Sequence, residues 1–189
     1  MSNPILDQTF DSQNFSGKKL ESKEYDNCTF INCNFSDTDI SVVTFLECEF
    51  NNCNFGSILM KATSFQEVLF SGCKMLGLDF SGCNTFMFSV VFDHCNLDYA
   101  SFFGFEMKNT MFKSCSLKEV DFTNANIKGA VFDQCDMAKT VFDNTNAEKT
   151  DFRTAKNYSI DPDNNILKKA KFSKFGLLGL LSKYDLDIE

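Results

Sequence analysis

Residues 28–55 read CTFINCNFSDTDISVVTFLECEFNNCNF, and this stretch decides the fold. A large apolar side chain stands at every fifth position: Phe30, Phe35, Ile40, Phe45, Phe50 and Phe55. Two residues before each of them stands a small side chain: Cys28, Cys33, Thr38, Val43, Cys48 and Cys53. A period of five matches neither the 3.6-residue period of a helix nor the two-residue period of a strand.

The same spacing continues through most of the chain. It runs from Phe10 to Phe80, slips by two residues, and resumes from Met87 to Phe152. We expect the two extra residues to form a bulge near residues 81–85. At a period of 20, one column across this slip holds Phe10, Phe30, Phe50, Phe70, Phe92, Phe112, Phe132 and Phe152, and another holds Cys33, Cys53, Cys73, Cys95, Cys115 and Cys135. Because both columns cross the slip, the sequence predicts one domain.

A period of five predicts a four-sided solenoid in which each side points one large and one small residue inward. Four sides make a coil of 20 residues. One coil cannot bury its own apolar centre, whereas stacked coils bury a continuous one. Coils stacked at the strand spacing of about 4.8 Å would place the phenylalanines in an offset aromatic ladder.

These repeats resemble those of the pentapeptide-repeat proteins. The resemblance implies an all-β fold, a right-handed quadrilateral β-helix of about seven coils with a short C-terminal capping or dimerisation helix. We accordingly divide the chain into a lead-in at residues 1–7, the β-helix at residues 8–154, and a connector, helix and tail at residues 155–189.

The C-terminal segment has a different pattern. Ser173 is the expected N-cap of a helix at about residues 174–183. Its apolar residues cover most of the circumference, so we expect burial on more than one side. They are Phe175, Leu177, Leu178, Leu180, Leu181 and Tyr184. Two interpretations stay open: the helix only caps the last coil, or it also joins two copies in a twofold dimer through these residues.

The residue types that most often carry chemistry form no catalytic arrangement here. The nine cysteines stand at or near the small inward position, and a column inside an apolar rod does not close a tetrahedral metal site. We interpret them as small buried apolar side chains. His94, the single histidine, stands at an outward position with no nucleophile or orienting partner predicted nearby. We expect no enzyme activity, no cofactor and no metal.

The net charge of −8, from 26 acidic and 18 basic residues, argues against direct nucleic acid binding through phosphate contacts. No window approaches 18 uncharged apolar residues, so no membrane span is predicted. The first residues lack the basic start and apolar run of a secretory signal. These features predict a cytoplasmic protein.

Two outward surfaces are candidates for binding a partner. Outward acids offer negative charge to a basic groove, and the candidates are Asp79, Asp93, Asp98, Glu119, Asp121 and Asp133. The second surface is an apolar stripe just before the phenylalanine column: Leu69, Val91, Met111 and Val131. Each surface also has a plainer interpretation. The acids form a solvated surface that keeps the rod soluble, and the stripe reflects β-propensity without a binding role.

A long five-residue repeat followed by an apolar helix resembles the quinolone-resistance proteins Qnr and their relative MfpA. The matching features are Cys and Phe at the inward positions and the tail at Lys168–Leu181. The resemblance implies a head-to-head homodimer and an acidic rod that imitates duplex DNA. It also implies binding to the type II topoisomerases DNA gyrase and topoisomerase IV, with protection from fluoroquinolones.

One departure concerns loops. Several Qnr proteins carry two longer loops that are needed for protection, whereas this chain has only the slip near residues 81–85 and is closer to MfpA. The competing interpretation is a non-enzymatic interaction scaffold that binds another partner through the apolar stripe.

Overall fold

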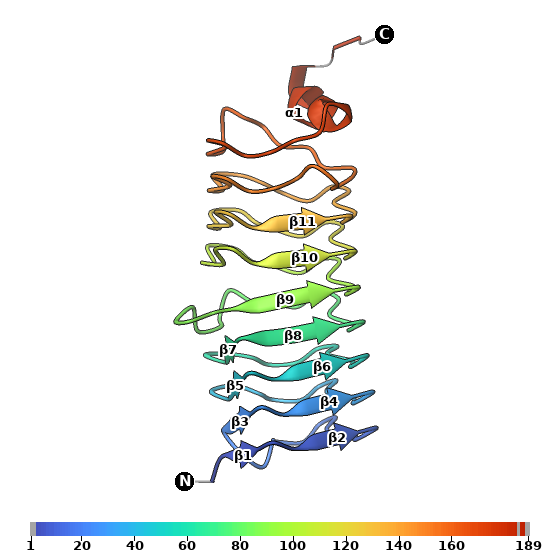
Figure 1. Ribbon diagram of the computed structural model, residues 1–189, viewed down its shortest axis with the longest axis vertical. Helices are drawn as coiled ribbons and strands as arrows, with labels where there is room; N and C mark the ends of the chain where they lie inside the picture. The colour runs from blue at the N-terminus through green and yellow to red at the C-terminus, as the bar shows by residue number, and fades with distance from the viewer. Residues whose placement is uncertain (1–2, 185, 188–189) are drawn as a thin grey trace.

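The chain folds into a four-sided rod of stacked coils with a short helix at its C-terminal end (Figure 1). This computed structural model describes residues 3–184 and 186–187. Coils lie on one another in parallel, so residues 20 apart become neighbours, as in the pairing of Phe30 with Phe50. The predicted all-β parallel solenoid with a short C-terminal helix is confirmed.

Two adjacent sides of the rod form continuous parallel sheets. One contains, in spatial order, β1 (Ile5–Leu6), β3 (Glu24–Asp26), β5 (Thr44–Leu46) and β7 (Ser64–Gln66). The other contains seven strands: β2 (Thr9–Asp11), β4 (Thr29–Ile31), β6 (Glu49–Asn51), β8 (Val68–Ser71), β9 (Val90–Asp93), β10 (Met111–Lys113) and β11 (Val131–Asp133). The strands are short because the chain turns a corner after every side. Isolated parallel bridges hold the other two sides, for example between Asn34 and Asn54.

Each corner requires a residue in the left-handed conformation two positions after the large inward side chain. Asn52 and Gly72 occupy this position with φ of 55° and 64°. A Cβ atom on Gly72 would lie 2.3 Å from the Asn52 side-chain oxygen, so the site also needs glycine for space. Val42 adopts φ of 59° although it is β-branched, and its N–H donates to the Lys61 carbonyl at 2.9 Å. Hydrogen bonds between coils therefore impose the corner even on an unfavourable residue.

The core is a ladder of stacked aromatic rings that fills the rod. Phe112 lies between Phe92 and Phe132, with ring centroids 5.1 and 4.9 Å away and interplanar angles of 12° and 8°. It also meets Phe122 of the opposite side edge to face at 6.4 Å. The predicted column is therefore a continuous stack, and it runs from Phe10 to Phe172.

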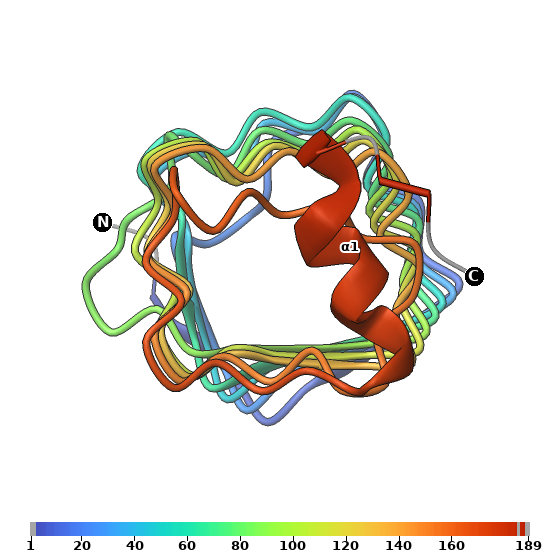
Figure 2. The same ribbon diagram turned by 90° about the horizontal axis from the view of Figure 1, so that it is seen from above.

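The two extra residues form a small loop at residues 85–88, seen as a projection from the outline of the rod in Figure 2. Asn84 still makes the regular hydrogen bond between coils, to the Thr63 carbonyl, whereas Val90 pairs with Val68 across 22 residues. The bulge thus lies slightly after the predicted residues 81–85. The extra residues are expelled outward because the stacked interior has no room for them.

This loop corrects one inward assignment. Met87 was expected to point into the core, but it lies on the loop and is 59% exposed. Phe88 instead packs edge to face on the buried Phe105, with ring centroids 4.9 Å apart. Phe105 stands where other coils have a small inward residue, so a larger side chain sits in the core beside the loop.

The coils continue beyond residue 154, where the sequence analysis placed their end. Asn146 bridges to Ile166, and Asp151 bridges to Lys171. Phe172 stacks on Phe152 with centroids 5.3 Å apart. The segment assigned as a connector therefore adds further coil structure, because its backbone completes the ladder of hydrogen bonds left open by the coil before it.

The C-terminal helix crosses the open end of the last coil (Figure 2). It consists of a 3₁₀ turn at Phe175–Leu177, α1 at Leu178–Leu181 and a second 3₁₀ turn at Ser182–Tyr184, close to the predicted range. The Ser173 hydroxyl accepts a hydrogen bond from the Gly176 N–H at 3.1 Å, but the N-cap of the first turn is Lys174, one residue after the expected Ser173. Within the described ranges, every helix is too short to cross a membrane.

The ladder predicts a large difference between a stacked phenylalanine and an exposed one. Phe112→Ala should lower the free energy of unfolding by about 3–5 kcal/mol, because it leaves a cavity in the stack. Phe103→Ala is the control: Phe103 is 50% exposed, and its loss should change stability by less than about 1 kcal/mol. Urea unfolding followed by circular dichroism measures both. Equal losses would show that the stack does not carry the stability.

Candidate functional site

The filled interior leaves the outer surface as the place where this protein can act. Each side exposes the residues before and after the inward side chain, and the pattern repeats in every coil. The six acids predicted as a contact surface are all present on this exterior, but the structure does not bring them together. They are distributed over three sides of the rod.

Two of these acids lie on the seven-stranded side. Asp93 and Asp133 both pair in register with Lys113, which lies between them. The Asp93 carboxylate lies 4.0 Å from the Lys113 amine and 2.6 Å from the ring nitrogen Nδ1 of His94. The Asp133 carboxylate accepts a hydrogen bond from the Thr154 hydroxyl at 2.8 Å. These acids are therefore interleaved with cationic and donor groups.

The other four acids lie on the next two sides. Asp79 and Asp121 share a column and are separated by Ser101. Asp98 accepts hydrogen bonds from the Ser116 hydroxyl and the Lys118 N–H. Glu119 is 3.7 Å from the amine of Lys139. Of the six, Asp79 and Glu119 are exposed and the other four are half-buried.

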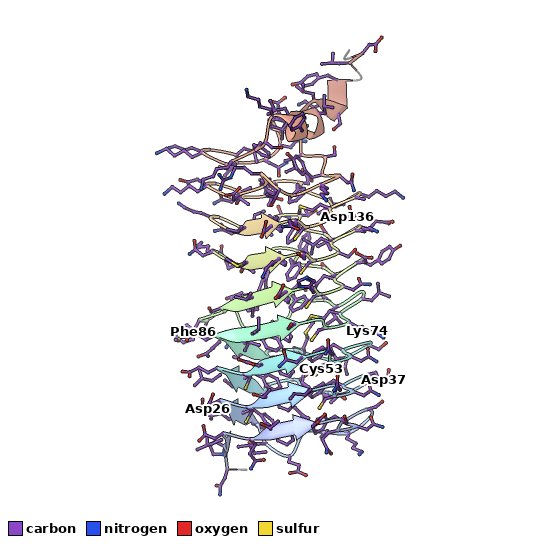
Figure 3. All side chains as sticks on the ribbon, turned by 45° about the vertical axis from the view of Figure 1, so that its right-hand side comes forward. Asp26, Asp37, Cys53, Lys74, Phe86 and Asp136 are labelled. Carbon is purple, nitrogen blue, oxygen red and sulfur yellow. The ribbon has the colours of Figure 1, made fainter. Side chains whose placement is uncertain are left out.

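The charge is unevenly distributed along the rod. Residues 1–100 contain 13 acidic and 5 basic residues, a net charge of −8, whereas residues 101–189 contain 13 of each and are neutral overall. Every ion pair found among the described residues joins groups from Asp93 onward. The carboxylates of the first coils, including Asp26 and Asp37 in Figure 3, have no such partner in the described part of the chain.

The opposite end has no net charge over residues 161–189, which contain five lysines and five acids. Residues 165–184 contain five lysines and no acid. Only Lys171 and Lys183 of these lysines pair with carboxylates, those of Asp151 and of Asp161 and Asp163, among the residues that the structure places. The rod thus has an acidic N-terminal half and a C-terminal half that is neutral overall, a difference that the total charge conceals.

The apolar stripe is a real feature of the seven-stranded side. Leu69, Val91, Met111 and Val131 are consecutive neighbours across β8, β9, β10 and β11. Val91 and Met111 are exposed, and the other two are half-buried. A groove of about 450 Å³ lies beside the stripe, lined by Met111, Val131, Asp133, Asp151, Arg153 and Thr154.

The loop at residues 85–88 adds a second apolar projection. Phe86 is 69% exposed and points away from the rod in Figure 3. Periodicity alone indicated the slip, but it could not tell which side chains leave the core.

The helix presents most of its predicted interface residues to solvent. Phe175 is 94% exposed, and Leu177, Leu178, Leu181 and Tyr184 are also exposed, whereas Leu180 packs against the core. A Cβ atom on Gly179 would lie 2.3 Å from the Tyr158 carbonyl oxygen, so glycine allows the helix to sit close to the last coil. One face therefore caps the rod and the other is uncovered in the single chain.

The cysteines are buried and used as hydrogen-bond donors inside the rod. All nine are free thiols. The Cys53 Sγ donates to the Phe30 carbonyl and the Cys115 Sγ to the Phe92 carbonyl, both at 3.4 Å. Burial raises the pKa of Cys48 and of Cys83 to about 12. Among the described residues, no cluster of three or more side chains is suited to hold a metal ion.

These observations define a class of protein, a four-sided parallel β-solenoid made of five-residue repeats. Family models agree: the pentapeptide repeat region matches residues 23–102, and pentapeptide repeats (8 copies) match residues 89–129 and 115–153. The chain belongs to the pentapeptide-repeat proteins. No curated protein matches its sequence.

The fold is similar to that of solved Qnr structures. One trypsin-treated variant of QnrB1, a plasmid-mediated fluoroquinolone resistance protein, has a TM-score of 0.65 and 18% identity, with 100% of this chain and 99% of that chain covered. A second trypsin-treated variant has a TM-score of 0.50 and 20% identity, with both chains fully covered. At this identity the likeness is one of fold.

The buried thiols predict a loss of stability at high pH. An unfolded thiol loses its proton near pH 9, whereas Cys48 and Cys83 keep theirs in the folded protein until about pH 12. The folded state then binds more protons, so the free energy of unfolding should fall as the pH rises from about 9 towards 12. Urea unfolding at pH 8 and pH 10 measures the slope. A Cys48→Ala/Cys83→Ala variant should lose less stability over this interval, and an unchanged slope would contradict the assignment.

Proposed function

We propose that this protein is a non-catalytic, DNA-mimicking rod that binds DNA gyrase or topoisomerase IV in the cytoplasm and lowers susceptibility to fluoroquinolones. The observation that carries the proposal is the likeness in fold to QnrB1 over the whole chain, with a TM-score of 0.65. The net charge of −8 supports it, because a topoisomerase binds duplex DNA in a basic groove.

The distribution of charge indicates where the partner would bind. The exposed acids Glu47, Glu49 and Glu67 lie in or beside the third and fourth strands of the seven-stranded side, β6 and β8, where no ion pair neutralises them within the described chain. Of the six acids predicted from sequence, Asp79 belongs to this acidic half. Carboxylates already paired with lysine offer less charge to a partner, so the first coils favour contact most.

We also propose a homodimer joined through the C-terminal helix. The exposed face of Phe175, Leu178 and Leu181 is apolar and close to the end of the rod. Residues 161–189 have no net charge, so the attraction between two copies would come from burial of this apolar face. In such a dimer the acidic halves point outward.

The apolar stripe supports a second candidate function. Four consecutive apolar residues on one sheet, two of them exposed, are typical of a contact surface. A scaffold that binds a different protein through Val91 and Met111 would use hydrophobic burial rather than charge. Binding of this kind depends little on salt, which separates the two candidates.

A supercoiling assay tests the first candidate. Purified protein titrated into gyrase and relaxed plasmid, with and without ciprofloxacin, should inhibit supercoiling or rescue it from the drug. The effect should fade as salt rises, because screening weakens contacts between exposed charges. An effect that persists at high salt would favour the stripe, and no effect on gyrase or topoisomerase IV would refute the proposal.

Paired variants locate the contact. Glu47→Gln/Glu67→Gln removes two charges from the acidic half and should weaken the effect on gyrase several-fold. Glu106→Gln/Glu148→Gln changes the net charge equally, but these acids pair with Lys108 and Lys128. This second variant should therefore weaken the effect on gyrase less than the first. Equal effects would mean that only total charge matters.

The helix variant Leu178→Glu/Leu181→Glu should be monomeric, because charges in the apolar face oppose its burial. Size-exclusion chromatography with light scattering measures the mass. Leu59→Glu/Leu76→Glu, at exposed positions on the rod, is the control and should keep the dimer mass. A helix variant with twice the chain mass would refute this interface.

A further inference from the structure

The side of the rod that begins with β1, β3, β5 and β7, here called the four-stranded side, is divided in the middle by the loop at residues 85–88. Before the loop this side is the four-stranded sheet. After the loop the same side continues as parallel bridges that join Glu106, Asn126, Asn146 and Ile166 in turn. Asp26 of the first half and Phe86 of the loop lie along the same edge of the rod in Figure 3. Four coils therefore lie on this side before the loop, and four lie after it.

The two halves of the four-stranded side carry opposite charge. Residues 3–7, 23–27, 43–47 and 63–67 contain five acids and one lysine, a net charge of −4. Residues 105–109, 125–129, 145–149 and 165–169 contain five lysines and two glutamates, a net charge of +3. The acids before the loop are Asp7, Glu24, Asp26, Glu47 and Glu67, and the lysines after it are Lys108, Lys128, Lys149, Lys168 and Lys169. Eight of these ten side chains are exposed, and Asp26 and Lys128 are half-buried.

The lysines of the second half make a common positive surface. The Lys128 amine is 2.7 Å from the Glu148 carboxylate. This contact, together with the charges of Lys149 and Lys168, lowers the pKa of Glu148. Lys149, Lys168 and Lys169 form no ion pair with any group in the described part of the chain. Their charge therefore remains available to the carboxylates of a partner.

Acids and lysines match in reverse order about the loop. Glu67 lies one coil before the coil that carries the loop, and Lys108 lies one coil after it. The further matches, at two, three and four coils from the loop, are Glu47 with Lys128, Asp26 with Lys149, and Asp7 with Lys168 and Lys169. Because coils repeat at about 4.8 Å, each acid and its match are equally far from the loop. A second copy turned end over end about the loop thus sets its lysines against these acids.

The loop offers an apolar contact at the centre of this arrangement. Phe86 and Met87 are exposed, whereas Phe88 packs on the buried Phe105 and anchors the loop to the rod. In a twofold pair each residue near the axis meets its equivalent in the other copy. Phe86 and Met87 of the two copies would then bury one another, while the long lysine and glutamate side chains cross the space beside the loops.

We propose that two copies of this chain pair side by side and antiparallel through the four-stranded side, with a twofold axis at the loop of residues 85–88. The occupant is a second copy because the acids and lysines of one chain match in this register. The contact is narrow and consists mostly of exposed charges, so the association is weak and reversible. It differs from the end-to-end dimer at the helix and goes beyond the proposed function. It covers Glu47 and Glu67, so the paired form withholds these acids from any other partner.

Crosslinking at the axis tests the geometry in the full chain. Met87→Cys adds one accessible thiol, since the nine natural cysteines are buried, and a short bismaleimide should join two copies through it. The product should form at about 0.1 M salt, where charges beyond about 10 Å are screened and the facing pairs are not. It should fall at least about fivefold at about 1 M salt, where screening acts within about 3 Å. Leu76→Cys, an exposed position on the opposite side of the rod, is the control and should give little product.

Charge reversal tests the register. Glu47→Lys/Glu67→Lys and Lys108→Glu/Lys128→Glu, each combined with Met87→Cys, should each lower the crosslinked product about tenfold, because like charges then face one another. An equal mixture of the two should restore the product, since the reversed halves face each other in the mixed pair. Restoration also shows that both variants are folded.

A matched control changes the net charge on the opposite side of the rod. Lys118→Glu/Lys139→Glu has the same charge change as the lysine variant, and its lysines are likewise paired with acids. Combined with Met87→Cys, it should keep most of the crosslinked product.

Three results would overturn the proposal: no more product from Met87→Cys than from Leu76→Cys at about 0.1 M salt, a product that persists undiminished at about 1 M salt, or a mixture of the reversed variants that does not restore it. These assays contain no topoisomerase, so their failure would leave the proposed function standing, and a failed supercoiling assay would leave this pairing standing.

Discussion

The structure depends on the burial of inward side chains between stacked coils. No coil has a core of its own, so each phenylalanine is covered only by the equivalent residues above and below it, as Phe112 is by Phe92 and Phe132. The backbone ladder and the left-handed corners keep these rings in register. Hydrophobic burial supplies the stability, and hydrogen bonds between coils supply the alignment that makes the burial complete.

A filled interior moves function to the surface. Because the coil repeats, neighbouring coils offer similar backbone geometry, and only the outward side chains distinguish one region from another. They do so by charge: the carboxylates of the first coils have no ion-pair partners among the described residues, whereas several of those in later coils pair with lysine. This polarity gives the rod one acidic half suited to a basic partner and a second half without net charge.

Irregular features lie where the repeat is interrupted. The loop at residues 85–88 leaves the coil because two extra residues have no place in the stack, and it exposes Phe86 and Met87. At the C-terminal end, the helix covers the last coil only in part. It leaves a cavity beside Tyr158 and an uncovered apolar face around Phe175. The loop and the C-terminal end, where the repeat is interrupted, are therefore also the places whose exposed side chains differ most from those of the regular coils.

The sequence by itself determined the repeat, the inward columns, the apolar stripe and the short C-terminal helix, because these follow from the spacing of residues along the chain. Sequence spacing misplaced the bulge, pointed Met87 inward and ended the coils at residue 154, because backbone pairing between coils decides which residues stay in the ladder. Which acids are paired with lysine depended on the tertiary structure, since residues 20 apart become neighbours only there. The cavity beside Tyr158 arises where the helix meets the coil, a contact that no periodicity encodes.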